Sequence, residues 1–135
     1  MISVDTNVLL RIYANDNPEQ KRTVLSLLGS SPAGHVRVSV VVLAEIAWAL
    51  RSVYKLPKPA MVEVFLDLLS REELYIEHRA AVFSALTSFG RFRIDFGDCL
   101  IAALNEDAGA SPTYTFDLKA SALNAFASLG EKGGA

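Results

Sequence analysis

The feature that most constrains the fold is an alternation of short apolar runs, rich in β-branched residues, with longer segments of helical period. The runs lie at residues 1–4, 35–42, 74–76 and 113–116. Runs of this kind favour β-strands, and apolar side chains spaced three and four residues apart favour amphipathic helices. Strands that alternate with helices form parallel sheets covered by helices. The sequence therefore predicts an α/β fold with a central parallel sheet of four to five strands flanked by helices.

The helices are predicted from their periodicity and from the residues at their ends. Asn17 followed by Pro18 is typical of a helix start, and Gly109 is typical of a helix end. We expect helices at residues 8–13, 18–28, 43–50, 61–69, 80–89, 95–108 and 118–129. The sequence leaves open whether a final edge strand follows the last helix, because the segment after Leu129 is rich in glycine. We expect one domain over residues 1–130 and a disordered tail at 131–135.

Composition limits the class of protein. The chain has 135 residues, of which 51% are hydrophobic, enough to bury the core of one domain. Its formal net charge is -2, so a polyanionic partner must be held by local features. The single cysteine, Cys99, excludes an internal disulfide and a zinc site built from cysteines, and it fits a reducing cytoplasm. We find neither the pattern of a signal peptide nor an apolar stretch of ~20 residues, and therefore expect a cytoplasmic protein with no membrane span.

Four acidic residues adjoin apolar segments that we expect to be buried: Asp5, Glu45, Asp98 and Asp117. A carboxylate near a core is costly unless a partner compensates its charge. In open parallel sheets, functional residues gather beyond the carboxyl ends of the strands, and Asp5 and Asp117 each follow a predicted strand. The simpler alternative for Asp5 and Asp98 is a helix cap. Asp95 is the better cap candidate for the later helix, and it can add supporting charge near Asp98.

Carboxylates that converge in one pocket require a counter-charge. Two of them about 4 Å apart repel each other by roughly 4 kcal/mol at an effective dielectric constant of about 20. Without a cluster of His or Cys, the ligands are all oxygen, which selects Mg²⁺ or Mn²⁺. Such ions lower the pKa of bound water and stabilise a phosphate under attack. The acids therefore indicate metal-dependent hydrolysis of phosphodiester bonds by one ion or by two.

Four segments together resemble the PIN domain family, and more closely its VapC-type toxins: ISVDTNVLLR, VVLAEIAWALR, DFGDCLIAAL and TYTFD. The resemblance covers almost the whole chain, in the order and at the spacing that the family uses. It implies a PIN-like parallel sheet flanked by helices. It also implies an endoribonuclease that depends on Mg²⁺ or Mn²⁺ and serves as the toxin of a type II toxin-antitoxin pair.

The same resemblance assigns roles to individual residues and partners. The catalytic metal ligands that it implies are Asp5, Glu45, Asp98 and Asp117. Thr6, Asn7 and Thr115 align with polar residues that support these acids in the family. The family also implies a homodimer, neutralised by a small cognate antitoxin whose C-terminal segment covers the active-site groove.

The RNA-binding residues are less strongly indicated. The basic residues near the motifs, which can contact phosphates but equally suit an ordinary surface, are Arg11, Arg91, Arg93 and Lys119. No aromatic pattern identifies a base-reading site, and we expect Trp48 and the phenylalanines in the core. His35 and His78 are expected at the surface or at strand edges. The sequence identifies neither the target RNA and its cleavage position nor the antitoxin.

Three alternatives remain beside the ribonuclease. A phosphatase with an aspartate nucleophile requires a second acid two residues after Asp5, where this chain has Asn7. A receiver-type phosphotransfer domain requires adjacent acids early in the chain and a lysine after the last strand, where this chain has Asp117. A catalytically inactive PIN-like binding module has no need of the four acids, although all four are present.

Overall fold

The computed structural model describes residues 1–130, so the predicted disordered tail at 131–135 lies outside the described residues. The chain divides into two compact units, Met1–Glu77 (unit 1) and His78–Ala135 (unit 2), and each is described by itself. Among the described residues, no helix has both the length and the apolar character needed to cross a bilayer.

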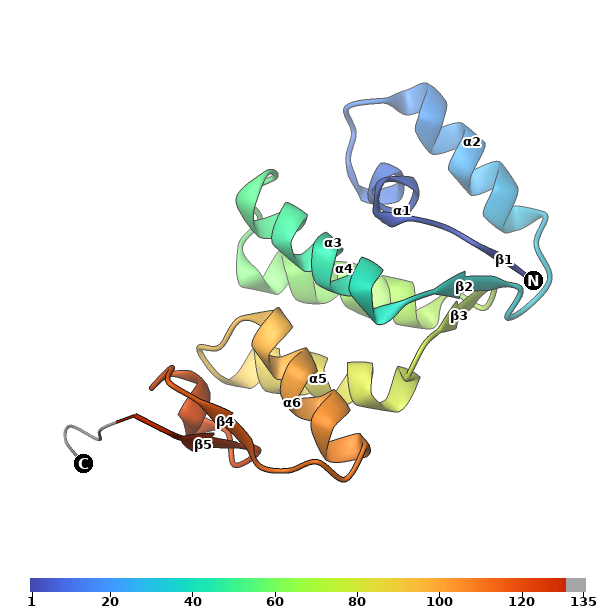
Figure 1. Cartoon of the computed structure of the whole chain (residues 1–135). Coiled ribbons are helices and arrows are strands. Elements are labelled where there is room, and N and C mark those ends of the chain that lie inside the picture. The colour runs from blue at the N-terminus through green and yellow to red at the C-terminus, as the bar shows by residue number, and fades with distance from the viewer. Residues whose placement is uncertain (131–135) are drawn as a thin grey trace. The chain divides into compact units, whose positions relative to one another are not determined.

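Unit 1 is a three-stranded parallel sheet with four helices (Figure 1). Its elements are β1 (Ile2–Ser3), α1 (Thr6–Tyr13), α2 (Pro18–Gly29), β2 (Val36–Val38), α3 (Val40–Ser52), α4 (Lys58–Ser70) and β3 (Leu74–Ile76). The strand order is β1-β2-β3, with Ile2 opposite Val36 and Val36 opposite Leu74. A helix follows β1 and another follows β2, so residues at the carboxyl ends of these strands begin helices.

The core of unit 1 is formed by the sheet and by the inward faces of its helices. Val36, Val38, Leu9, Ile46 and Phe65 are fully buried. At the periphery, the Tyr13 hydroxyl donates a hydrogen bond to Asp67 (2.6 Å), which also accepts one from Arg71 (3.0 Å). This network ties α1 to α4. Burial and the hydrogen bond to the Asp67 carboxylate raise the pKa of Tyr13, which keeps the donating hydroxyl protonated.

The strand predicted at residues 35–42 is longer than the strand in the structure, β2. It ends at Val38, and α3 begins inside the same β-branched run at Val40. Two side chains satisfy the exposed amides of this helix start: Ser39 accepts from the Val42 N–H (3.3 Å) and Glu77 accepts from the Val40 N–H (3.0 Å). Glu77 also pairs with Arg37. These caps, one of which comes from a distant part of the chain, outweigh the β propensity of three valines.

Unit 2 contains two helices and a two-stranded parallel sheet. Its elements are α5 (Arg79–Arg91), α6 (Phe96–Asp107), β4 (Thr113–Thr115), the 3-10 helix η1 (Ala120–Ala122) and β5 (Phe126–Ser128). Phe89 and Phe96 meet edge to face between α5 and α6, with ring centroids 5.8 Å apart. The Asn105 side chain donates to the Thr113 hydroxyl (2.9 Å) and links α6 to β4. The helix at 95–108 and its glycine end are confirmed, because Gly109 has a positive φ of 77°.

The helix predicted at 118–129 is wrong. The Asp117 carboxylate accepts hydrogen bonds from the Lys119 and Ala120 amides, and the chain makes only the short turn η1. It then extends into β5, where Phe126 pairs with Thr113. A final strand therefore exists, at residues where the sequence favoured a helix.

The α/β class with parallel strands is confirmed, but the strands are not in one continuous sheet. All five described strands pair in parallel, three in unit 1 and two in unit 2. Each strand is only two or three residues long. The strands β1, β2 and β3 form one sheet, and β4 and β5 form a second.

Candidate active site

Asp5 lies at the junction between β1 and α1, where it is exposed and caps the helix. Its Oδ1 accepts a hydrogen bond from the Val8 N–H at 3.1 Å. A carboxylate has two oxygens and several acceptor positions, so capping and metal binding are compatible. The cap also fixes the orientation of the side chain at the start of α1. Asp5 thus has the local role that the simpler alternative predicted, without losing its capacity as a ligand.

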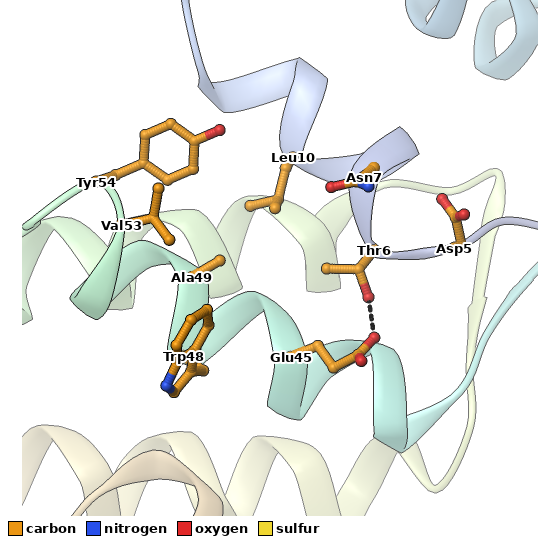
Figure 2. A pocket seen from close by; sticks show the side chains of 9 residues that line it. All are labelled: Asp5, Thr6, Asn7, Leu10, Glu45, Trp48, Ala49, Val53 and Tyr54. Atoms are coloured by element: carbon orange, nitrogen blue, oxygen red, sulfur yellow. Dashed lines mark hydrogen bonds between the residues drawn. The ribbon is translucent and has the colours of Figure 1, made fainter.

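Glu45 projects from the second turn of α3 toward the start of α1. The Thr6 hydroxyl donates a hydrogen bond to Glu45 Oε1 at 2.5 Å, as the dashed line in Figure 2 shows. Residues 6 and 45 are far apart in the sequence, so this contact connects two motif segments directly. The predicted proximity of Thr6 to an acid is therefore seen in the structure.

Asp5 and Glu45 line one pocket of about 650 Å³ that lies wholly within unit 1. Its polar end is formed by Asp5, Thr6, Asn7 and Glu45. Its remaining wall is apolar and aromatic, formed by Leu10, Trp48, Ala49, Val53 and Tyr54. Figure 2 shows the two parts following one another along α3, from Glu45 toward Tyr54. The structure brings together all four unit 1 residues that the sequence nominated as ligands or supports.

Asp98 occupies the third position of α6 and is half-buried. Burial raises the pKa of Asp98, and the negative charges of Asp95 and Asp117 raise it further. The charges of two motif-region acids of unit 2 therefore act on a third, Asp98. Asp95 occupies the cap position of α6, but its side chain makes no capping hydrogen bond.

Asp117 follows β4 and is held by the backbone around it. Its own N–H donates to the Thr115 hydroxyl (3.0 Å), and its Oδ1 accepts from the Lys119 N–H (2.8 Å). Thr115 thus supports the turn that positions Asp117. The carboxylate is exposed.

Three of the four acids are exposed to solvent. These are Asp5, Glu45 and Asp117, and none of the charged side chains in the described part of the chain is buried. The expected burial of the adjoining apolar segments holds beside Glu45, where Leu43 and Ile46 are buried. It is wrong beside Asp5 and Asp117, where the apolar neighbours Met1, Ile2, Tyr114 and Phe116 are exposed. On α3, Leu43, Ile46 and Leu50 face the core while Glu45 faces away.

The donor chemistry of both groups fits a hard cation, since every acid offers carboxylate oxygen. Within residues 1–130, however, no group of three or more His, Cys, Asp or Glu side chains is close enough to hold a metal ion. The pair Asp5 and Glu45 belongs to unit 1, and the pair Asp98 and Asp117 belongs to unit 2. Convergence of the two pairs on one ion stays a prediction.

Two of the four basic residues predicted to bind RNA make contacts with neighbouring side chains. Arg11 pairs with Asp16 (2.6 Å) and donates a hydrogen bond to the Tyr54 hydroxyl (2.9 Å). Its guanidinium therefore binds a residue that lines the pocket. Arg91 lies over the ring of Phe92 at 5.7 Å. Arg93 and Lys119 are exposed, as are His35 and His78.

The aromatic wall of the pocket was missed by sequence reasoning, which placed Trp48 in the core. Trp48 is 65% exposed, and Phe83 and Phe116 are also exposed. The spacing of the residues along the helix could have indicated that Trp48 is exposed. Trp48 lies three residues after Glu45 and therefore on the same helical face, whereas the buried face of α3 carries Leu43 and Ile46.

The comparison with protein families covers nearly the whole described chain. The family model for the PIN domain matches residues 2–125. The chain belongs to the PIN domain family. No match was found among curated proteins. Because PIN domains are generally nucleases, the two acidic groups lie on a nuclease fold.

Proposed function

We propose that this PIN domain is a Mg²⁺- or Mn²⁺-dependent endoribonuclease whose ligands are Asp5, Glu45, Asp98 and Asp117. The observation that carries the proposal is that the motif acids are already grouped within each unit. Asp5 and Glu45 line one pocket, and Asp98 experiences the charge of Asp117. Family membership supports the joint use of both groups, because the match from residue 2 to residue 125 includes all four acids.

The chain's own residues provide fixed carboxylates. The Thr6 hydroxyl holds Glu45, and the turn that follows β4 holds Asp117. Carboxylates that are fixed before the reaction bind a cation without further reorganisation. A bound Mg²⁺ or Mn²⁺ would lower the pKa of a water molecule and stabilise charge on the attacked phosphate. Burial and the negative charges of Asp95 and Asp117 raise the pKa of Asp98, and a bound cation would favour its ionised form.

The direct test uses the purified protein with a panel of transfer, ribosomal and messenger RNAs. We expect cleavage with Mg²⁺ or Mn²⁺, none with a chelator, and products with a 5′-phosphate and a 3′-hydroxyl. Product ends are determined by sequencing, which also identifies the cleavage position. Cleavage that persists in the chelator would contradict the metal-dependent reaction.

A matched pair of variants on α6 tests whether the site acids are responsible. Asp98→Asn removes one charge from the proposed site, and Asp107→Asn removes the same charge from the far end of the same helix. We expect the first to lose almost all cleavage, on the order of 10³-fold in kcat/KM, without unfolding of the protein, and the second to leave cleavage unchanged. Full activity of Asp98→Asn would remove Asp98 from the site.

We further propose that the protein is the cytoplasmic toxin of a type II toxin-antitoxin pair and acts as a homodimer. This role is supported by the resemblance of DTNVLL and DCLIAA to VapC-type toxins. Induced expression should arrest growth, co-expression of the cognate antitoxin should relieve the arrest, and Asp98→Asn should be harmless. Light scattering of the purified protein measures its oligomeric state. Unchanged growth despite confirmed ribonuclease activity would contradict the toxin role alone.

A further inference from the structure

Trp48 is a large aromatic side chain that faces solvent beside the proposed catalytic acids. It is 65% exposed, and it lies one helical turn after Glu45 on the same face of α3. Both residues line the same pocket (Figure 2). Trp is highly buried in most folded proteins, so an exposed Trp in a pocket indicates a surface that a ligand covers.

Hydrogen bonds hold one residue of the pocket wall that Trp48 helps to form. The Tyr54 hydroxyl accepts a hydrogen bond from Arg11 (2.9 Å), and Arg11 is itself anchored by Asp16 (2.6 Å). Ala49 and Leu10 complete this part of the pocket and are buried. The pocket therefore offers a flat aromatic face, supported by a pre-organised apolar wall, next to two carboxylates.

We propose that Trp48 stacks on an unpaired nucleobase of the RNA, adjacent to the phosphate that is cleaved. The inference rests on the proposed ribonuclease function and narrows its substrate to RNA with a single-stranded nucleotide at the cleavage position. A base inside a duplex has both faces covered by its neighbours, whereas a splayed base offers a face for stacking on an aromatic side chain.

The composition of the pocket favours a nucleotide over an apolar protein segment. A nucleotide has an anionic phosphate and a flat apolar base joined by one sugar, and the pocket has cation ligands at one end and Trp48 at the other. Trp48 lies three residues after Glu45 on α3, which is a rise of ~4.5 Å along the helix axis. An apolar segment that filled the pocket would instead desolvate Asp5 and Glu45 without compensation.

Kinetics of two Trp48 variants and one matched control form the first half of the test. We expect Trp48→Ala to raise KM on the order of 10- to 100-fold with little change in kcat, because stacking contributes to binding. Trp48→Phe keeps an aromatic face and should recover most of the loss. Val41→Ala is the control, since Val41 is equally exposed on the same face of α3 but lies outside the pocket. Equal KM values for all three variants would overturn the inference.

Fluorescence provides a readout that a structural role would not change. Trp48 is the only tryptophan of the chain, so its emission reports on this position alone. The Asp98→Asn variant is titrated, with Mg²⁺ present, with a single-stranded RNA oligonucleotide, the same strand made abasic, and the duplex. We expect strong quenching by the single strand and little by the other two. Equal quenching by all three, or none by the single strand, would overturn the proposed stacking.

The two halves separate failure of this inference from failure of the proposed function. If wild type cleaves RNA but Trp48 emission is insensitive to the single strand, the ribonuclease stands and the stacking is wrong. If no RNA is cleaved with any divalent metal, the proposed function fails.

Discussion

The two acidic groups differ in how their charge is balanced. In unit 1, Glu45 accepts a hydrogen bond from Thr6 and Asp5 accepts one from the α1 backbone. In unit 2, partial burial raises the pKa of Asp98, and the negative charges of Asp95 and Asp117 raise it further. Hydrogen-bond donors thus hold the unit 1 pair, whereas burial and neighbouring negative charge disfavour the ionised form of Asp98. The comparison teaches that hydrogen bonds can stabilise the ionised carboxylates in one acidic group, while the surroundings in another disfavour ionisation until a cation binds.

The largest expected effect tests whether the two groups serve one site. Asp5→Asn and Asp98→Asn should each lower kcat/KM on the order of 10³-fold, because each removes a ligand of the proposed catalytic ion. The double variant should be little worse than either single one, since groups that act as a unit are not additive. Steady-state cleavage of one defined RNA measures all three. Losses that multiply would mean that the groups act independently.

A smaller effect is expected from the donor that organises the unit 1 pair. Thr6→Ala removes the hydroxyl that binds Glu45 and should lower kcat/KM by roughly tenfold, the scale of one hydrogen bond to a charged group. Thr6→Ser keeps the hydroxyl and should stay close to wild type. If Thr6→Ser is as impaired as Thr6→Ala, packing of the methyl group and not the hydrogen bond is what matters.

The start of α3 provides the next test, because this helix carries Glu45. Glu77→Ala removes the acceptor of the Val40 N–H and the partner of Arg37, and should lower the free energy of unfolding by ~1–2 kcal/mol. Urea unfolding followed by Trp48 emission reports on unit 1. Glu72→Ala, at an exposed position nearby, should shift the midpoint by less. Equal shifts would show that Glu77 does not stabilise this helix start.

The smallest effect concerns the charge around Asp98. Asp117→Asn should lower the pKa of Asp98, which should still remain above its ordinary value because burial, the largest cause, is unchanged. Since the folded-state pKa is raised, ionising Asp98 costs stability as pH rises above the ordinary aspartate range, and this cost should shrink in the variant. Carboxyl NMR titration without metal measures the shift. An unchanged pKa would show that Asp117 exerts no charge effect on Asp98.

Local chemistry in the sequence predicted much of the fold. Asn17 caps α2 through its side chain (3.0 Å to the Gln20 N–H), with Pro18 at the first helical position, as expected. The parallel strands and the motif acids at strand ends and helix starts were also predicted. These features depend on residues close in sequence, so no knowledge of the tertiary structure was needed to infer them.

The errors have a common physical origin. The run at 35–42 was divided between β2 and α3 by a cap from Glu77, and the segment after Asp117 became β5 because it pairs with β4. At the start of α3 the local cap Ser39 also contributes, and in both places a partner far along the chain helped to override the local propensity. Trp48 was placed in the core from its apolar character alone, although its helical position assigns it to the solvent-facing side of α3.

The sequence by itself determined the class of fold, the family and the identity of the acidic residues, because strand and helix periodicity and the motif order are properties of the chain. Only the tertiary structure decided which faces are covered and which remain open. Burial depends on what packs against each face, and it left Glu45, Trp48 and Tyr54 lining one pocket while Leu43 and Ile46 on the same helix formed the core.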